Sequence, residues 1–416
     1  TAGTGSPLRT STTSTSSTRR EQSIQKGEPA MHAGFLHVAS LVARLRSGSA
    51  GAQEQPRSQE LAAVELIRLM LDNADSGAAI ARAGAIEPLV ALVRGGSAGA
   101  QEKAAGALAY LAVNADNGVA IAQAGAIEPL VAMLRGGSAA AQEEAAFALS
   151  RLATRNAANQ VDIARAGAIE PLVALVRGGS AEAQEEAAFA LGNLASGNAA
   201  NKVAIARAGA IEPLVALLHG GSAGAQEAAA LALSYLATGN AANQVDIARA
   251  GAIEPLVALV RSSSAGAQEM AAATLSNLAF DNADNQAAIV LAGAVEPLVT
   301  LMRLSPHARR AAIMTLLSLA SSADTLAAFA QADIIKPLIA WTRGGTAEAQ
   351  ERESGVEAAA LLKALAANSV EIKRAINRTG GVGPQGRRIG GPAGVQEKVA
   401  DALHNLGSNI LLTVVA

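Results

Sequence analysis

The feature that most limits what this chain can fold into is a short phrase, Ile-Glu-Pro-Leu-Val, that recurs along most of its length. Variants of the phrase continue toward the C-terminus, and successive prolines are 40 to 42 residues apart. These prolines are Pro88, Pro129, Pro171, Pro213, Pro255, Pro297 and Pro337. A fixed period of this length predicts a stack of supersecondary units, because no single unit can bury its own apolar face.

The unit that begins at Asn198 predicts three helices of increasing length. Asn198 suits a helix N-cap, and the short first helix ends at Gly209. The second helix opens near Ala210 and tolerates Pro213 in its first turn, where a missing N–H costs nothing. Ser222 caps a long third helix rich in Ala and Leu. The sequence therefore predicts an all-α stack of three-helix units.

The recurring motifs Gly-Ala-Ile-Glu-Pro-Leu-Val, Gln-Glu-x-Ala-Ala-x-Ala-Leu and Asn-Leu-Ala resemble armadillo repeats. They are most similar to plant, fungal and protist proteins of the vacuolar-protein-8 type. The resemblance covers roughly residues 33–416 and implies a right-handed α-solenoid of about nine armadillo repeats, with degenerate repeats at both ends. Fold alone does not define function, so the resemblance implies only a class of binding protein.

Composition excludes several functional classes. The chain has a formal net charge of −2 and a pI of about 6.2, which does not favour nucleic-acid binding. It has no cysteine, so disulfides and thiolate metal sites are excluded, and a reducing compartment is expected. No apolar run reaches the ~18 residues of a membrane span, so membrane insertion is not expected.

The two ends of the chain differ from the repeats. Residues 1–30 are rich in Ser and Thr and predict a disordered tail, with a targeting segment as the alternative. The solenoid is expected over residues 31–416, beginning with a second helix at Met31–Arg46 and a third helix at Gln59–Leu71. Residues 380–391 are rich in glycine and are expected to replace a helix of the last repeat with a loop.

No catalytic or metal-binding motif stands out. The five histidines do not share metal-site spacing, and distant repeats of a solenoid do not converge on one reaction centre. Gly381–Gly386 matches G-x-G-x-x-G, but helices precede it where a dinucleotide site requires a strand. We therefore expect no enzyme activity, no cofactor and no metal.

The resemblance implies that the third helices line a concave groove, in which one position per repeat often carries an Asn that holds a partner's backbone. We call this position the ladder position. In chain order it holds Arg68, Tyr110, Arg151, Asn193, Tyr235, Asn277, Ser318, Ala364 and Asn405. The position four residues earlier lies on the same side of the helix. It holds Phe147 and Phe189 in adjacent repeats.

Scarce aromatic side chains gather on this inferred stripe. Both tyrosines of the chain, Tyr110 and Tyr235, occupy the ladder position, and Phe147 and Phe189 are two of only five phenylalanines. Large side chains concentrated on one surface are typical of recognition sites. The alternative is that Phe147 and Phe189 fill the core between repeats, and the sequence does not decide between the two.

Acidic residues accompany the stripe. A Glu recurs eight residues before the ladder position, and Glu144 and Glu186 lie beside two of these residues. Favourable charge early in a helix explains them, and recognition of a basic segment is the alternative.

Together these observations predict a non-enzymatic, monomeric scaffold that binds an extended protein segment, basic and apolar in character. The expected contacts are Tyr110, Phe147, Arg151, Phe189, Asn193, Tyr235, Asn277, Glu144 and Glu186. The alternatives are the substrate-recognition region of a larger ubiquitin ligase or other multidomain protein, and a nuclear-transport adaptor of the importin-α type. We expect the protein in the cytoplasm, with the nucleus as an additional location.

Overall fold

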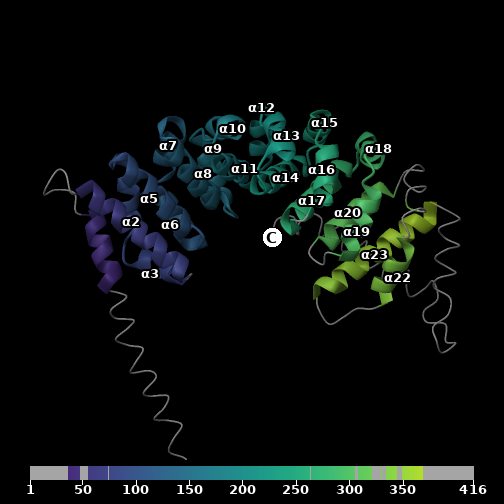
Figure 1. Cartoon of the computed structure of the whole chain (residues 1–416), viewed down its shortest axis with the longest axis horizontal. Coiled ribbons are helices and arrows are strands. Elements are labelled where there is room, and N and C mark those ends of the chain that lie inside the picture. The colour runs from purple at the N-terminus through teal and green to yellow at the C-terminus, as the bar shows by residue number, and fades with distance from the viewer. Residues whose placement is uncertain are drawn as a thin grey trace, which may run out of the picture. The chain divides into compact units, whose positions relative to one another are not determined.

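The protein is known from a computed structural model that describes residues 36–46, 55–73, 75–262, 264–304, 308–320, 329, 334–343 and 349–368. Within these residues all regular structure is helical (Figure 1). The chain divides into two compact units, Thr1–Ala126 and Ile127–Ala416, and each is considered by itself. The expected tail over residues 1–30 and the glycine-rich loop over residues 380–391 lie outside the described residues.

The helices follow the predicted order of first, second and third helix in each repeat. The first helices are α3 (Ser76–Arg82), α6 (Ala115–Gln123), α9 (Ala157–Arg165), α12 (Ala199–Arg207), α15 (Ala241–Arg249) and α18 (Ala283–Leu291). The second helices are α4 (Ile86–Gly95), α7 (Ile127–Gly136), α10 (Ile169–Gly178), α13 (Ile211–Gly220), α16 (Ile253–Val260), α19 (Val295–Leu304) and α22 (Ile335–Arg343). The third helices are α2 (Gln55–Asp72), α5 (Ala98–Leu111), α8 (Ala139–Ala153), α11 (Ala181–Ala195), α14 (Ala223–Ala237), α17 (Ala265–Ala279), α20 (Arg309–Leu319) and α23 (Ala349–Asn368).

Unit 1 contains a helix over residues 36–46 and the helices α2 to α6. The predicted second helix at Met31–Arg46 is confirmed over residues 36–46. The predicted third helix at Gln59–Leu71 is confirmed, but it begins four residues earlier, at Gln55. Pro56 explains the difference, because a proline in the first turn removes no helical hydrogen bond.

The repeat geometry follows from its capping residues. The Ser222 hydroxyl accepts a hydrogen bond from the backbone N–H of Ala225, 3.1 Å away, and the equivalent serines cap the other third helices from α5 to α17. Asn198 caps α12 in the same way through the N–H of Asn201. Gly209 ends α12 with a φ of +73°, a conformation that favours glycine. The predicted helix ends of this repeat are confirmed to within a few residues.

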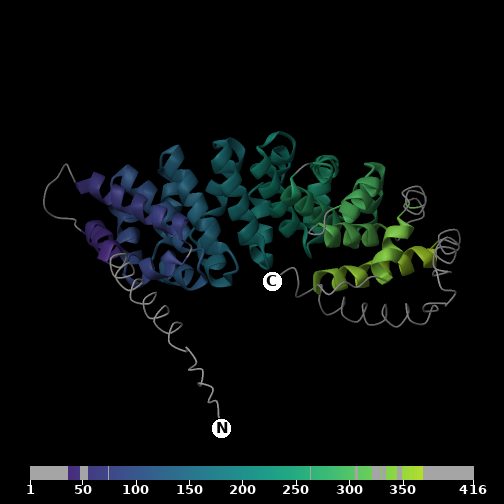
Figure 2. The ribbon, with the colours of Figure 1, turned by 60° about the horizontal axis from the view of Figure 1, so that its bottom comes forward.

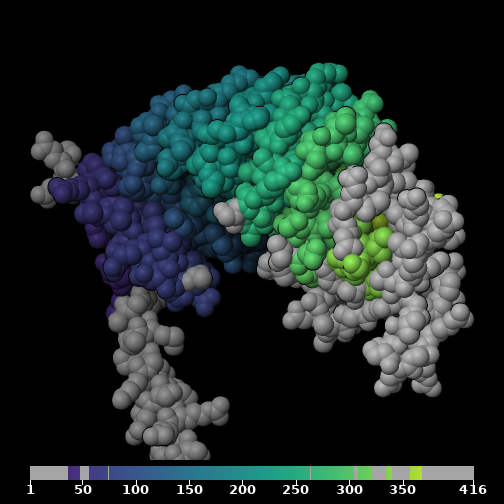
Figure 3. Space-filling model, turned by 45° about the vertical axis from the view of Figure 1, so that its right-hand side comes forward, coloured from purple at the N-terminus to yellow at the C-terminus, as the bar shows by residue number. Residues whose placement is uncertain are grey.

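Unit 2 is held together by its third helices, which pack side by side in chain order from α8 to α20 (Figures 1 and 2). Small side chains let these helices approach closely. A β-carbon at Gly192 on α11 would lie 3.2 Å from the α-carbon of Ala232 on α14. Leu149, Leu191 and Leu233 are buried between the helices. In the space-filling view the side chains of successive repeats of unit 2 form a continuous surface (Figure 3).

The first helices add buried polar links between repeats. The amide of Asn201 on α12 donates to the carbonyl of Gln160 on α9 and to that of Leu194 on α11. Asn285 on α18 makes the equivalent pair of bonds. These amides are buried, so each bond satisfies groups that water does not reach.

Candidate binding surface on the third helices

The residues predicted to bind a partner lie on two units. Tyr110 is half-buried on α5 of unit 1. The others lie on adjacent third helices of unit 2, and we call them together the third-helix surface. They are Glu144, Phe147 and Arg151 on α8, Glu186, Phe189 and Asn193 on α11, Tyr235 on α14 and Asn277 on α17.

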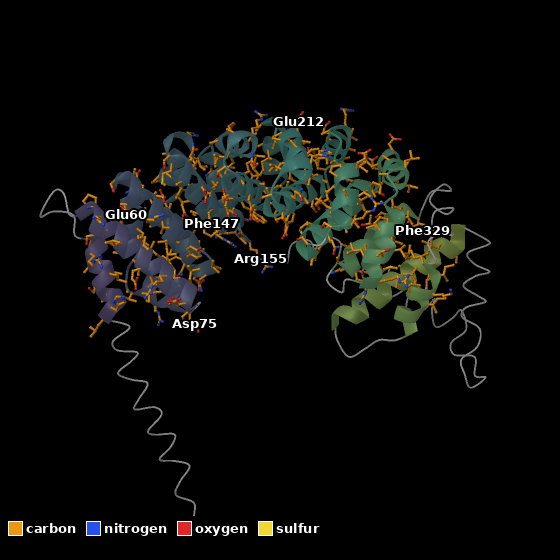
Figure 4. The ribbon with its side chains drawn as sticks, viewed as in Figure 1. Glu60, Asp75, Phe147, Arg155, Glu212 and Phe329 are labelled. Atoms are coloured by element: carbon orange, nitrogen blue, oxygen red, sulfur yellow. The ribbon has the colours of Figure 1, made fainter. Side chains whose placement is uncertain are left out.

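The aromatic side chains of the third-helix surface are neither fully buried nor fully exposed. Phe147, Phe189 and Tyr235 are all half-buried, whereas the leucines between the helices are covered. The guanidinium of Arg151 lies over the ring of Phe147, 5.0 Å from its centroid, in a cation–π contact. The intermediate exposure of Phe147 and Phe189 leaves part of each residue accessible and part covered. Figure 4 shows Phe147 on the opposite side of the ribbon from Glu212, which lies on α13.

The ladder asparagines have a role that was not predicted from the sequence. Nδ2 of Asn193 lies 3.1 Å from the carbonyl oxygen and the hydroxyl of Ser150 and 3.2 Å from the hydroxyl of Thr154. These acceptors are at the end of the preceding third helix, α8. Asn277 repeats the arrangement on Ser234 and Thr238. Both amide groups thus already donate within the protein, which leaves Asn193 and Asn277 less suited to hold a partner's backbone than expected.

The hydrogen bond from a ladder asparagine to a serine of the preceding repeat is present on α11 and α17 but not on α14, which lies between them. Asn193 and Asn277 face serines in the preceding repeat, whereas Tyr235 follows a repeat with Gly192 at the serine position. The signal was present in the sequence as the pairs Ser150–Asn193 and Ser234–Asn277, each 43 residues apart. It was missed because a polar pair between repeats is visible only once the register of the third helices is known.

The acidic residues create an unusual electrostatic environment around Glu186. Burial raises the pKa of the Glu186 carboxyl to about 7; Arg151 opposes this rise, and the carboxylates of Glu185, Glu143 and Glu144 add to it. Burial also raises the pKa of Glu185, with smaller contributions from Glu227 and Glu182. Near neutral pH the third-helix surface therefore carries a carboxyl group that a nearby positive charge would ionise.

The glutamates eight residues before the ladder position contact the next repeat. Glu185 on α11 lies against Gly224 in the first turn of α14, and a β-carbon at Gly224 would overlap its carboxylate. Glu227 lies against Gly266 of α17 in the same way. The carboxylates are thus near the positive end of the neighbouring helix, which supports the structural explanation for them.

The arginines that end the second helices are also links between repeats. Arg177 donates to the carbonyl oxygen of Gly209 in the next repeat at 2.9 Å, and Arg135 reaches Gly167 at the same distance. Pairing of these arginines with the helix macrodipole alone does not account for these hydrogen bonds. On α13 the equivalent position holds His219. The glycine equivalent to Gly209 in the next repeat is Gly251, and no side chain lies within 4 Å of a β-carbon placed on it.

The two cavities described in unit 2 lie elsewhere, between successive second helices. One, of about 570 Å³, is lined by Arg135, Gln142, Glu170 and Pro171, and the other, of about 510 Å³, by the equivalent residues of later repeats. In the described part of the chain, no group of three or more His, Asp or Glu side chains is arranged to hold a metal. No single described helix has the length and apolarity for a membrane span, and four bent helix pairs meet that test jointly.

Comparison with known proteins identifies the architecture. The family model of the plant U-box protein ARM repeat region matches residues 42–339. The chain belongs to the armadillo repeat family. Among solved armadillo-like structures, one engineered protein has a TM-score of 0.72 and 30% identity, over 91% of this chain and 97% of that one. A second engineered protein has a TM-score of 0.54 and 35% identity, over 57% of this chain and 99% of that one.

A designed armadillo repeat protein in complex with the peptide (KR)4 is also similar, with a TM-score of 0.52 and 28% identity. It matches 56% of this chain and 99% of its own. A search of curated proteins gave no match. The predicted all-α armadillo solenoid is therefore confirmed, whereas the likeness to the vacuolar-protein-8 type stays a prediction.

Proposed function

We propose that the protein is a non-enzymatic scaffold that binds an extended, basic and apolar segment of a partner protein across the third-helix surface. The observation that carries the proposal is the juxtaposition of half-exposed Phe147 and Phe189 with Glu186. An apolar anchor beside a partly desolvated carboxylate suits a lysine or arginine side chain, whose methylene groups pack on a ring while its charge reaches an oxygen.

The comparison with a designed armadillo protein supports this choice of partner. That protein is described in complex with a peptide of alternating Lys and Arg. The contacts within the third-helix surface alter the list of expected binding residues. Phe147, Phe189, Glu186 and Tyr235 have accessible atoms for a ligand, whereas the Asn193 amide is engaged by α8.

Fluorescence anisotropy with a labelled (Lys-Val)4 peptide tests the proposal. We expect the Phe147→Ala and Glu186→Gln variants each to weaken binding about fivefold or more, as is typical of central contacts. Phe280→Ala is the matched control, because Phe280 is exposed at the end of α17 and outside the third-helix surface. Equal affinity for the parent, Phe147→Ala and Glu186→Gln proteins would refute the assignment.

The pH dependence of this binding offers a second readout. A lysine side chain of the peptide stabilises the ionised form of Glu186, whose pKa is about 7 in the free protein. The affinity for (Lys-Val)4 should therefore rise roughly threefold to tenfold between pH 6 and pH 8. The Glu186→Gln variant should lose most of this dependence.

The family match favours a second candidate, the substrate-recognition region of a larger ubiquitin ligase, because the matched model describes plant U-box proteins. The sequence of the full-length transcript tests it: an encoded U-box would support this function, and a transcript without one would remove it. The nuclear-adaptor alternative predicts salt-sensitive binding of Lys- and Arg-rich peptides. Location in the cytoplasm is part of the proposal, and a fluorescent fusion protein tests it.

A further inference from the structure

The end of α8 carries a backbone conformation that its side chain does not favour. Arg155 has a φ of +53°, in the left-handed region. The equivalent residues after α11 and α14 are glycines, Gly197 and Gly239, with φ values of +66° and +63°. Glycine adopts this region without the steric cost that a β-carbon brings. The chain therefore has an arginine where two sister repeats have glycine, and a third, after α17, has Asp281 in the same conformation.

Arg155 is accessible and uncommitted. Its side chain is exposed, and no hydrogen bond or ion pair of Arg155 occurs among the described residues. Figure 4 places it on the same side of the unit 2 ribbon as Phe147, away from the second helices. Arg151, four residues earlier on α8, is also exposed and held over Phe147. The Arg155 guanidinium thus follows the C-terminal end of α8, and the Arg151 guanidinium lies one turn earlier, over Phe147.

The favourable interaction of a cation with a helix C-terminus is not sufficient to explain this pair. The third helices α11 and α14 end without a basic residue in their last turn. The charge is therefore specific to α8. Arg155 follows the last turn of α8, eleven residues after Glu144, whereas the Arg151 charge is close enough to Glu186 to oppose the rise in its pKa.

The third-helix surface consequently has two charged edges, acidic toward the N-terminal halves of α8 and α11 and basic at the end of α8. An extended segment that crosses the helices directs successive side chains to opposite sides. One row of its side chains then faces the acidic edge and the other faces the basic edge. A uniformly basic segment would place like charges beside Arg151 and Arg155.

We propose that Arg151 and Arg155 bind a carboxylate side chain of the partner, so that the bound segment carries an acidic residue next to the basic residue that faces Glu186. This inference rests on the proposed function and specifies the charge pattern of its partner. An arginine pair is suited to a carboxylate, because each guanidinium presents several N–H donors in a fixed plane. The partner is thus a protein segment of alternating charge.

Peptide binding at low salt tests the inference with two matched probes, (Lys-Glu)4 and (Lys-Gln)4. Both span about 26 Å when extended, enough to cross two or three helices that are about 10 Å apart. We expect (Lys-Glu)4 to bind the parent protein roughly threefold to tenfold more tightly than (Lys-Gln)4. The Arg151→Ala/Arg155→Gly variant should bind the two peptides equally.

Asp281→Gly is the matched control for the backbone. Asp281 follows α17 with a φ of +51°, so its replacement relieves the same conformation but removes the opposite charge. Arg155→Gly should raise the melting temperature as Asp281→Gly does, yet only Arg155→Gly should reduce the preference for (Lys-Glu)4. A gain in stability together with a loss of binding separates a recognition role from a structural one.

The outcomes distinguish the inference from the proposed function. If (Lys-Gln)4 binds in a Glu186-dependent manner but (Lys-Glu)4 binds no better, the basic edge does not recognise a carboxylate and only the inference fails. If neither peptide binds the parent protein, both the proposed function and the inference fail. If the preference for (Lys-Glu)4 persists without Arg151 and Arg155, the carboxylate is bound elsewhere and the inference is wrong.

Discussion

Replacement of Asn193 by alanine removes a clamp between α11 and α8, and its cost follows from the bonds that it makes. Two amide protons serve three acceptors at 3.1–3.2 Å, one of which is the carbonyl of buried Ser150. A net 0.5–1.5 kcal/mol per hydrogen bond gives a loss of about 1–3 kcal/mol in the free energy of unfolding. Asn193→Asp should cost more than alanine, because a carboxylate oxygen would then face the Ser150 carbonyl.

A double-mutant cycle in urea isolates the clamp. Asn193→Ala, Ser150→Ala and the double variant should show a coupling energy of about 0.5–1 kcal/mol, since the two side chains are hydrogen-bonded at 3.1 Å. The equivalent cycle on Asn277 and Ser234 should give the same value within error. A coupling energy of zero at both sites, or an aspartate variant as stable as the alanine variant, would refute the clamp.

Three further predictions concern single positions of unit 2. His219→Arg should raise the free energy of unfolding by about 0.5 kcal/mol, because the arginine would donate to the Gly251 carbonyl as its sisters do in other repeats; an unchanged urea midpoint would count against it. The Glu186 carboxyl binds a proton more tightly in the folded protein than in the unfolded chain. The free energy of unfolding of the parent relative to Glu186→Gln should therefore fall as the pH rises from about 4.5 to 7. Urea titrations at several pH values measure this trend, and the reverse trend would contradict the raised pKa. Lys202 is buried, donates to the carbonyl of Thr238 and has a lowered pKa, so Lys202→Gln should stabilise the protein at pH 7, and a lower melting temperature would contradict this.

The sequence was sufficient to predict the architecture because its strongest signals are local. Ser222, Asn198 and Gly209 each determine a helix end through their own side chain or backbone freedom, and the period repeats this information many times. The start of α2 was misplaced because Pro56 permits a helix as readily as it ends one.

The candidate site was predictable only in outline. The positions of Phe147 and Glu186 on the third helices follow from spacing, but the pKa of Glu186 depends on its burial and on charges that include those of a neighbouring repeat. The use of the Asn193 amide depends on Ser150, which is 43 residues away. The strain at Arg155 is visible only in the backbone, where comparison with Gly197 and Gly239 reveals it. The first two of these facts arise from the register between repeats, and the third is a backbone property of a single position.

A crystal structure of the protein with (Lys-Glu)4 tests the central claim most directly. The account predicts that the peptide crosses α8, α11 and α14, with a lysine ammonium at the Glu186 carboxylate and a glutamate at the Arg151 and Arg155 guanidinium groups. A peptide bound along the first or second helices, with the third-helix surface unoccupied, would contradict it.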